Sequence, residues 1–146
     1  MPYIEPARRV ALAAAGFNPE AIASGCHSTT ELALALFGPC TSFAEMAYGT
    51  IPKATFGMRS PGDLNYVITT VCHAYIRQAG ISYTNMQNVV GALERLLDDF
   101  KAANHRHIGA EQVDSVVGAI RCAELELYAR KIRPYEDLKI TDNGDV

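Results

Sequence analysis

The sequence lacks the features of a membrane or secreted protein. No apolar run approaches the roughly 20 residues that a membrane-spanning helix needs. The apolar stretch 10–15 is short, and Glu5 and Pro6 interrupt the region before it, unlike a signal peptide. Cysteine is sparse, with 4 in 146 residues, and we expect free thiols in a reducing compartment. These absences predict a cytoplasmic protein that makes no membrane contact.

The chain also has no large excess of either charge. The chain has 13 Lys and Arg against 16 Asp and Glu, which gives a formal net charge of −3. A protein that binds duplex nucleic acid usually carries a basic face large enough to show in this total. We therefore expect no duplex nucleic-acid partner.

The familiar catalytic and cofactor motifs are missing as well. The chain contains neither of the glycine-rich phosphate loops, G-x-x-x-x-G-K-[ST] and G-x-G-x-x-G, and it lacks the G-x-S-x-G turn of many hydrolases. It also has no C-x-x-C or H-x-x-x-H pair of the kind that binds zinc. These absences favour a binding protein over an enzyme, and they predict no cofactor and no metal site.

Two adjacent residue pairs leave a metal-dependent enzyme open as an alternative. Cys26-His27 and Cys72-His73 supply ligand types that zinc accepts. Neighbouring residues on a helix do not face the same way, so the two members of one pair cannot easily share an ion. A site would have to combine both pairs, and this alternative predicts stoichiometric zinc in the purified protein.

What is present is a helical pattern broken by glycine and proline. Hydrophobic residues make up 49% of the chain, enough for one globular domain over residues 1–146. We expect an all-α helical bundle with short helices in the N-terminal half and three long helices in the C-terminal half. Residues 1–60 would form short helices and loops, 61–134 a three-helix core, and 135–146 a polar tail.

The short helices are predicted from local start and stop signals. They cover residues 7–15, 19–23, about 28–37, and 42–48. We expect Gly38 and Pro39 to stop the third of them, and Ser42 to cap the fourth.

The long helices are predicted from apolar residues at helical spacing. They cover residues 61–79, about 82–104, and 110–133. The apolar stripe of the third includes Leu125, which we therefore expect in the core. Pro134 should end or kink this helix, and Asn143-Gly144 predicts a turn in the tail.

A repeated element links the last two long helices. VVGAL at 89–93 is echoed by VVGAI at 116–120. A glycine inside a helix costs about 1 kcal/mol relative to alanine. We predict that the two helices cross near Gly91 and Gly118, within the chain or across a subunit boundary. A chance match between two helices rich in valine and alanine is the alternative.

The densest polar cluster lies on the third long helix and the start of the tail. Spacings of three and four put five side chains on one flank: Arg121, Glu124, Tyr128, Lys131 and Tyr135. Arg130 and Arg133 lie on an adjoining flank, and Asn65 with Tyr66 would join them if the helices pack side by side. Arginine forks and tyrosine rings suit phosphates and planar rings. The candidate ligand-binding residues are therefore Tyr66, Arg121, Tyr128, Arg130, Arg133 and Tyr135.

A solvated face with intrahelical ion pairs is the alternative interpretation of this cluster. Glu94 and Glu124 are expected on such faces, because no carboxylate in the chain lies in an apolar run that would raise its pKa.

Several short motifs form a specific combination at the N-terminus and in the second half. They are MPYI at 1–4, GDLNYVIT at 62–69, VVGALE at 89–94, CAELELY at 122–128, PYEDLKI at 134–140 and NGDV at 143–146. Together they resemble a family of short proteins from tailed bacteriophages and prophages. The resemblance implies a bacterial host cell as the location, and it implies no particular reaction.

The chain departs from that family's pattern in three places. Residues 9–60 form a longer spacer, 95–117 resemble an inserted turn and helix, and the family's arginine pair is Ala129-Arg130 here. A role that needs two adjacent arginines therefore does not carry over.

Small helical phage proteins without catalytic motifs are often inhibitors, sponges or regulators. We expect a non-enzymatic accessory protein that forms a homo-oligomer and binds a small anionic ligand, such as a cyclic nucleotide signal of bacterial immunity, as an anti-defence protein. A protein–protein adaptor that inhibits a host enzyme is the second hypothesis. The patterned tail is expected to dock on a neighbouring subunit.

Overall fold

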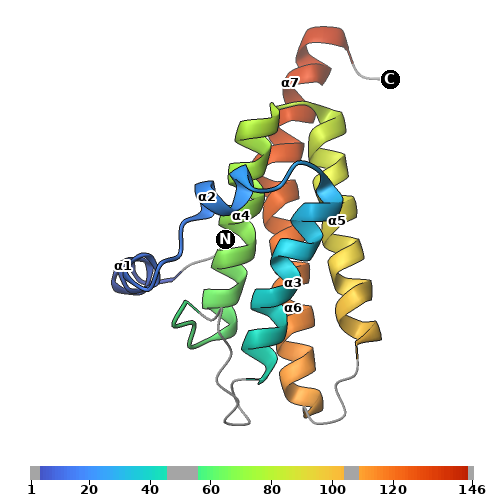
Figure 1. Ribbon diagram of the computed structural model, residues 1–146. Helices are drawn as coiled ribbons and strands as arrows, with labels where there is room; N and C mark the ends of the chain where they lie inside the picture. Colours follow the sequence, from blue (N-terminus) through green and yellow to red (C-terminus); the bar gives the residue numbers. More distant parts are fainter. Residues whose placement is uncertain (1–3, 46–55, 104–108, 145–146) are drawn as a thin grey trace.

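The computed structural model describes residues 4–45, 56–103 and 109–144. In chain order the helices are α1 (Pro6–Ala14), α2 (Pro19–Ser24), α3 (Thr29–Glu45), α4 (Pro61–Ala79), α5 (Tyr83–Ala102), α6 (Ala110–Leu127), the π-helical turn η2 (Tyr128–Ile132) and α7 (Arg133–Asn143). The four long helices α3 to α6 stand side by side as a bundle, and α7 rises beyond its end (Figure 1). The described residues contain no strand, so the all-α prediction is confirmed.

Local capping signals set the ends of the central helices. The Ser60 hydroxyl accepts the Asp63 N–H at 3.2 Å and begins α4, and the Ser82 hydroxyl accepts the Asn85 N–H at 3.1 Å and begins α5. Between them, Gly80 takes φ +109°, which a side chain would oppose. The predicted boundaries of these two helices are confirmed because the signals that set them lie within a few residues of each end.

The N-terminal half differs from its prediction at Gly38 and Pro39. We expected these residues to stop a short helix, but α3 continues through them to Glu45. Ser42, expected to cap a separate helix, lies inside α3, and residues 46–48 of that predicted piece lie outside the described residues. A proline inside a helix removes one hydrogen bond. Burial of Pro39, together with Cys40 and Phe43 on the same helix, offsets this loss.

Pro134 was predicted to end or kink the third long helix, and the first of these alternatives is wrong, because the helix continues past it. The Arg133 N–H donates to the Tyr128 carbonyl across one π turn, and α7 follows directly. The wider π turn gives the proline ring room against the preceding backbone, where it would otherwise clash. The tail is therefore helical as far as Asn143, and Gly144, at φ +81°, ends it.

Helix α1 is held against the bundle by apolar and charged contacts. Leu12 is its only buried residue. Arg8 reaches Asp63 on α4, with Nη2 to Oδ2 at 2.8 Å, and the same oxygen accepts the Arg59 N–H at 2.9 Å. Asp63 is only 2% exposed, so this carboxylate depends on those donors in place of water.

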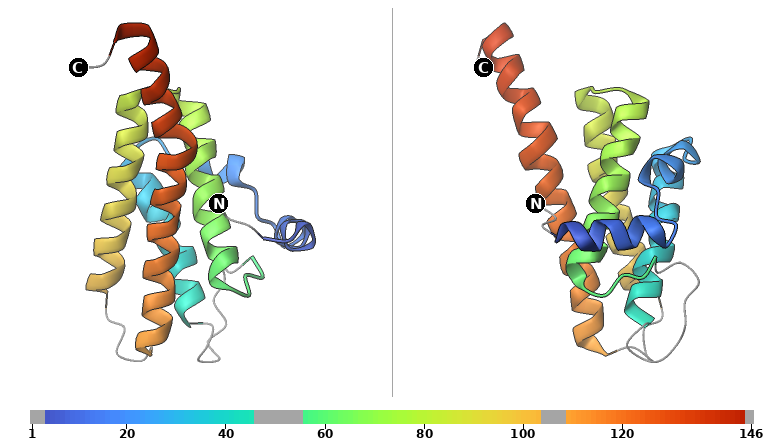
Figure 2. Two further views of the ribbon diagram at one scale, coloured as in Figure 1. Left: turned by 180° about the vertical axis from the view of Figure 1, so that it is seen from behind. Right: turned by 90° about the vertical axis from the view of Figure 1, so that its left-hand side faces the viewer.

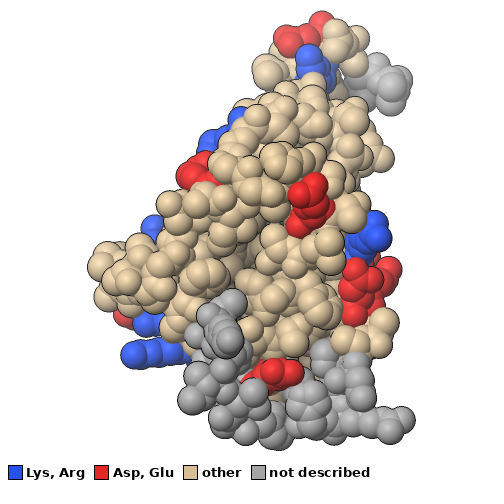
Figure 3. Space-filling view, in the orientation of Figure 1, with Lys and Arg blue, Asp and Glu red and all other residues tan. Residues whose placement is uncertain are grey.

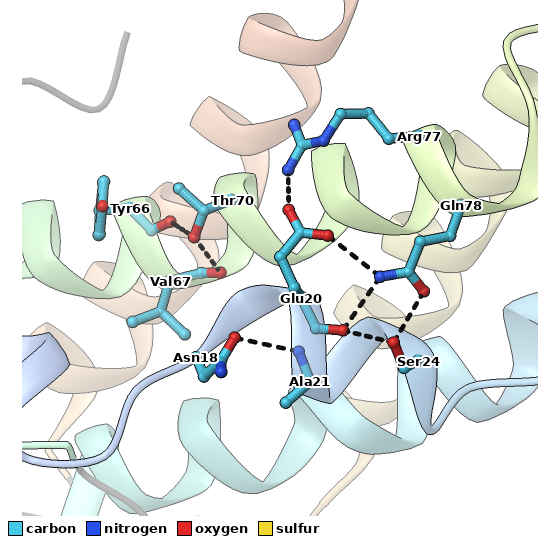
Figure 4. A network of polar contacts seen from close by, with 9 residues as sticks. All are labelled: Asn18, Glu20, Ala21, Ser24, Tyr66, Val67, Thr70, Arg77 and Gln78. Carbon is cyan, nitrogen blue, oxygen red and sulfur yellow. Dashed lines mark hydrogen bonds and ion pairs between the residues drawn. The ribbon is translucent and has the colours of Figure 1, made fainter.

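Helix α2 docks on α4 through polar side chains (Figure 4). Glu20 pairs with Arg77, and Gln78 donates to the Glu20 backbone carbonyl at 3.0 Å and accepts from the Ser24 hydroxyl at 3.2 Å. The Asn18 side chain accepts the Ala21 N–H and caps α2, as its sequence position predicts. This network is exposed, so it orients α2 more than it stabilises the fold.

Two predictions about the long helices are wrong within the chain. Among the described residues, a Cβ built on Gly91 or Gly118 would meet no atom within 4 Å, so no described helix crosses closely at either glycine. Leu125, expected in the core, is 68% exposed on the outside of α6. Both corrections concern the outward faces of α5 and α6, which the bundle leaves open.

Candidate functional site

The outward flank of α6 holds the first part of the predicted site. Arg121 reaches across to α5, where its Nη1 contacts Glu94 Oε1 at 2.7 Å, and it approaches Glu124 Oε2 at 3.5 Å on its own helix. The predicted cluster member Glu124 thus shares its arginine with a residue from another helix. Glu94, together with Glu124 when that residue is ionised, neutralises Arg121, which weakens its attraction for a free anion.

The environment of Glu124 differs more from the sequence-based prediction than that of any other residue discussed at this site. Burial raises its pKa to about 7, and the neighbouring Glu94 carboxyl adds to the rise, while Arg121 opposes it. Its Oε1 atom is buried and has no hydrogen-bond partner among the described residues. We expected a solvated carboxylate because Glu94 is thirty positions away in the sequence, and only the packing of α5 on α6 brings the two together.

A groove of about 660 Å³ lies between the start of α4 and α6. Asn65 on one wall is buried and donates from Nδ2 to the Ala119 carbonyl at 3.1 Å. Glu126 on the other wall is 9% exposed and accepts from Arg130 Nε at 2.8 Å. The remaining lining is mostly small or apolar, and includes Gly118, Cys122 and Leu125.

Tyr66 does not join the predicted cluster. Its ring packs against Phe17, with centroids 6.1 Å apart, and the Arg9 guanidinium lies 5.8 Å above it. These contacts place Tyr66 on the side of α4 that faces α1. Its neighbour Asn65 does face α6, because residues adjacent in a helix point in different directions.

The remaining predicted residues lie along η2 and α7. Tyr128 is 48% exposed, Arg133 is exposed, and Tyr135 packs partly against the core. Tyr135 also lines a second groove, of about 430 Å³, together with Tyr83 from the start of α5 and Lys139, Ile140 and Asn143 from α7. The six candidate residues therefore lie on three surfaces. Tyr66 faces α1, and Arg121 lies on the flank of α6 beside α5. The other four lie along η2 and α7: Tyr128, Arg130, Arg133 and Tyr135.

His73 on α4 lies in a cationic region between α4 and η2. Burial lowers its pKa to about 4, and the nearby charges of Lys131, Arg77 and Arg130 add to the effect. Its Nε2 atom is buried without a hydrogen-bond partner among the described residues. Sequence reasoning missed this region, since it considered His73 only as a zinc ligand.

These two shifted groups predict opposite dependences of stability on pH. Folding raises the pKa of Glu124 from 4.5 to about 7, so its contribution to stability is full below pH 4.5 and is lost as the pH rises to 7. Folding lowers the pKa of His73 from 6.5 to about 4, so its contribution is full above pH 6.5 and is lost as the pH falls to 4.

Single substitutions should separate these two effects. We expect Glu124→Gln to raise the unfolding free energy more at pH 8 than at pH 4.5, and His73→Gln to reduce the loss of stability between pH 6.5 and 4. Urea denaturation at these pH values measures both differences. An effect of Glu124→Gln that is equal at pH 4.5 and pH 8 would contradict the raised pKa.

The cysteine–histidine pairs do not form a metal cluster in the described part of the chain. No group of three or more His, Cys, Asp and Glu side chains there could hold an ion. Burial raises the pKa of the Cys72 thiol to about 12 and that of the Cys40 thiol still further. A thiol is a good ligand or nucleophile only as the thiolate, so these two are ill suited to either role.

Comparisons with known proteins bear on the chain as a whole. Among the described helices, none has the length and apolar character required to cross a membrane. No curated protein and no solved structure matches the chain. A family model described as a domain of unknown function, DUF6899, matches residues 1–110 and 95–146, two ranges that together span the whole sequence. The chain therefore belongs to the DUF6899 family.

Proposed function

We propose that this chain is a non-enzymatic adaptor that binds a protein partner through α7. The observation that carries the proposal is that α7, an 11-residue helix, buries none of its residues. It leaves the bundle and projects beyond the α4–α5 turn (Figures 1 and 2). Although α7 continues α6 and η2 without a break, it lacks the tertiary packing that supplies most helix stability, and a partner that covers it would provide this packing.

The end of the bundle beside α7 carries exposed apolar side chains. Leu138 and Ile140 on α7 are 58% and 45% exposed, and Ile81 and Tyr83 at the α4–α5 turn are 61% and 49% exposed. The groove between Tyr83 and α7 adds a concave element to this surface. Of the two α7 residues, Ile140 lines this groove, and Leu138, two positions earlier, points to another side of the helix. We call α7 together with Ile81 and Tyr83 the α7 surface. An apolar area of this kind at the edge of a fold is typical of protein interaction sites.

The charges near α7 favour a protein over a nucleic acid. Acidic and basic side chains mix at its tip, and the rest of the face drawn in Figure 3 shows no continuous basic strip. A phosphate backbone would select for such a strip. The phage resemblance favours a host enzyme as the partner, which the adaptor would inhibit or regulate.

Two variants test the adaptor proposal. We expect Leu138→Asp combined with Ile140→Asp to abolish a stoichiometric complex purified from host cells, because charges would be buried against the partner. Leu34→Asp is the matched control, since Leu34 is 65% exposed on α3 and far from α7 in the sequence. A complex that survives the double substitution sinks the proposal. If only the oligomer is lost, α7 docks on a second copy, as the sequence analysis expected of the tail.

A second candidate function is the binding of a small anion, and the region around His73 favours it. Burial is the largest cause of the lowered pKa of His73, and the nearby charges of Lys131, Arg77 and Arg130 lower it further, which is the effect expected of a cationic neighbourhood. Arg77 and Arg130 are each paired with a glutamate, which reduces the local positive potential. Native mass spectrometry of protein purified from cells undergoing nucleotide signalling tests this candidate. A bound mass of several hundred daltons that Lys131→Ala removes would support it, and a clean protein mass would contradict it.

A further inference from the structure

The outer face of α6 is a second surface that the bundle leaves uncovered. Seen from behind, α6 runs between α4 and α5 with no described helix in front of it (Figure 2, left). Five residues follow one another along this face, at spacings that alternate between three and four: Ser115, Gly118, Cys122, Leu125 and Ala129. All are exposed or partly exposed, and the first four line the groove beside α4. This spacing is that of a helix seam that packs against another helix.

The shape of the face suits a helix as its occupant. Leu125 projects with 68% of its surface exposed, while Gly118, two turns earlier, leaves space in which a Cβ would touch nothing. A projecting leucine next to a vacant glycine position gives a knob and a hole on one surface. Because the knob and the hole lie on either side of Cys122, a rotation about that residue brings each opposite the other.

We propose that the occupant is α6 of a second copy, packed antiparallel around Cys122. The charges at the two ends of the face are complementary in this arrangement. Glu111 and Asp114 are exposed near the start of α6, and Arg130 and Arg133 are exposed beyond its end. The acids stand eleven and eight residues before Cys122, and the arginines eight and eleven residues after it. An antiparallel pair therefore sets the acidic end of each copy against the basic end of the other.

A parallel pair would be disfavoured by the same residues. It would bring the two acidic ends together and the two basic ends together, and it would align the helix dipoles. Arg130 already pairs with Glu126 on its own helix, yet 42% of its side chain remains exposed to a second acid. The charge pattern thus selects both the second copy as the occupant and the direction of its helix.

The seam and the α7 surface share only Arg133, the first residue of α7. The paired stretch from Glu111 to Arg133 spans roughly 33 Å at 1.5 Å per residue, and α7 continues beyond it. Leu138 and Ile140 then lie outside the dimer interface. The dimer therefore does not depend on the proposed adaptor function, and Leu138→Asp with Ile140→Asp should leave it intact.

A charge-exchange experiment tests the dimer and its direction together. One variant carries Glu111→Arg and Asp114→Arg, so both ends of its seam are basic. The other carries Arg130→Glu and Arg133→Glu, so both ends are acidic. We expect each alone to sediment as a monomer, with self-association weakened at least tenfold. An equimolar mixture should form a heterodimer, because every end then meets the opposite charge.

Controls keep this test decisive. Circular dichroism and thermal melting of each variant show whether the fold is retained. A short bis-maleimide should link two wild-type chains through Cys122, the one exposed cysteine of the four, and Cys122→Ser should abolish the link. Wild-type protein that sediments as a monomer at 100 µM overturns the proposal. A dimer that both charge variants retain, or a mixture that stays monomeric, overturns the antiparallel seam.

Discussion

Replacement of Arg8 by methionine should lower the free energy of unfolding by about 3 kcal/mol. Asp63, at 2% exposure, would keep its buried carboxylate but lose the guanidinium whose Nη2 lies 2.8 Å from Oδ2. The Arg59 N–H at 2.9 Å would remain as a donor, and 23% of the Arg8 side chain is exposed. These two facts place the expected cost at the lower end of the range for broken buried ion pairs.

Urea denaturation of three variants measures this effect. Arg9→Met is the matched control, because the neighbouring Arg9 makes a cation–π contact with Tyr66, worth about 0.5–1 kcal/mol. Arg8→Met combined with Asp63→Asn should recover part of the loss, since no charge would then be buried unpaired. Equal costs for Arg8→Met and Arg9→Met would contradict the role given to the Arg8–Asp63 pair in holding α1.

Truncation of Leu93 to alanine should cost about 3–5 kcal/mol. Leu93 lies on α5 with no exposed surface, among the helices that form the core. Removing its side chain loses apolar burial and leaves a cavity that the close-packed core cannot fully close.

The same substitution on the surface provides the control for Leu93. Leu34 on α3 is 65% exposed, and Leu34→Ala should change stability by no more than about 0.5 kcal/mol. Thermal and urea unfolding of the two variants measure the difference. A cost below about 1 kcal/mol for Leu93→Ala would mean that α5 is not packed as described.

The sequence predicts the central helices well because their ends carry local signals. Ser60, Gly80 and Ser82 act through hydrogen bonds and backbone angles within three or four residues, so neighbouring positions suffice to recognise them. Pro39 and Pro134 mislead because their outcome depends on distant packing or on a π turn, and neither is visible in local sequence.

The candidate site was predicted only in part for a related reason. Spacing along one helix correctly placed Arg121 beside Glu124, but Glu94 joins them only through the contact of α5 with α6. Tyr66 was assigned to the wrong surface because its direction depends on Phe17, which lies in another segment. Leu125 follows the apolar pattern of a core residue yet faces outward, and this mismatch is itself the signal of an uncovered interaction face.

Site-specific photocrosslinking inside the host cell tests the adaptor proposal most directly. A photoreactive amino acid would replace Leu138 on α7 or, as the control, Leu34 on α3, two positions of similar exposure. The proposal predicts one crosslinked protein of defined mass, different from this chain, at Leu138 and none at Leu34. Crosslinks at Leu138 only to a second copy of the chain, or equal capture of the same proteins at both positions, would contradict it.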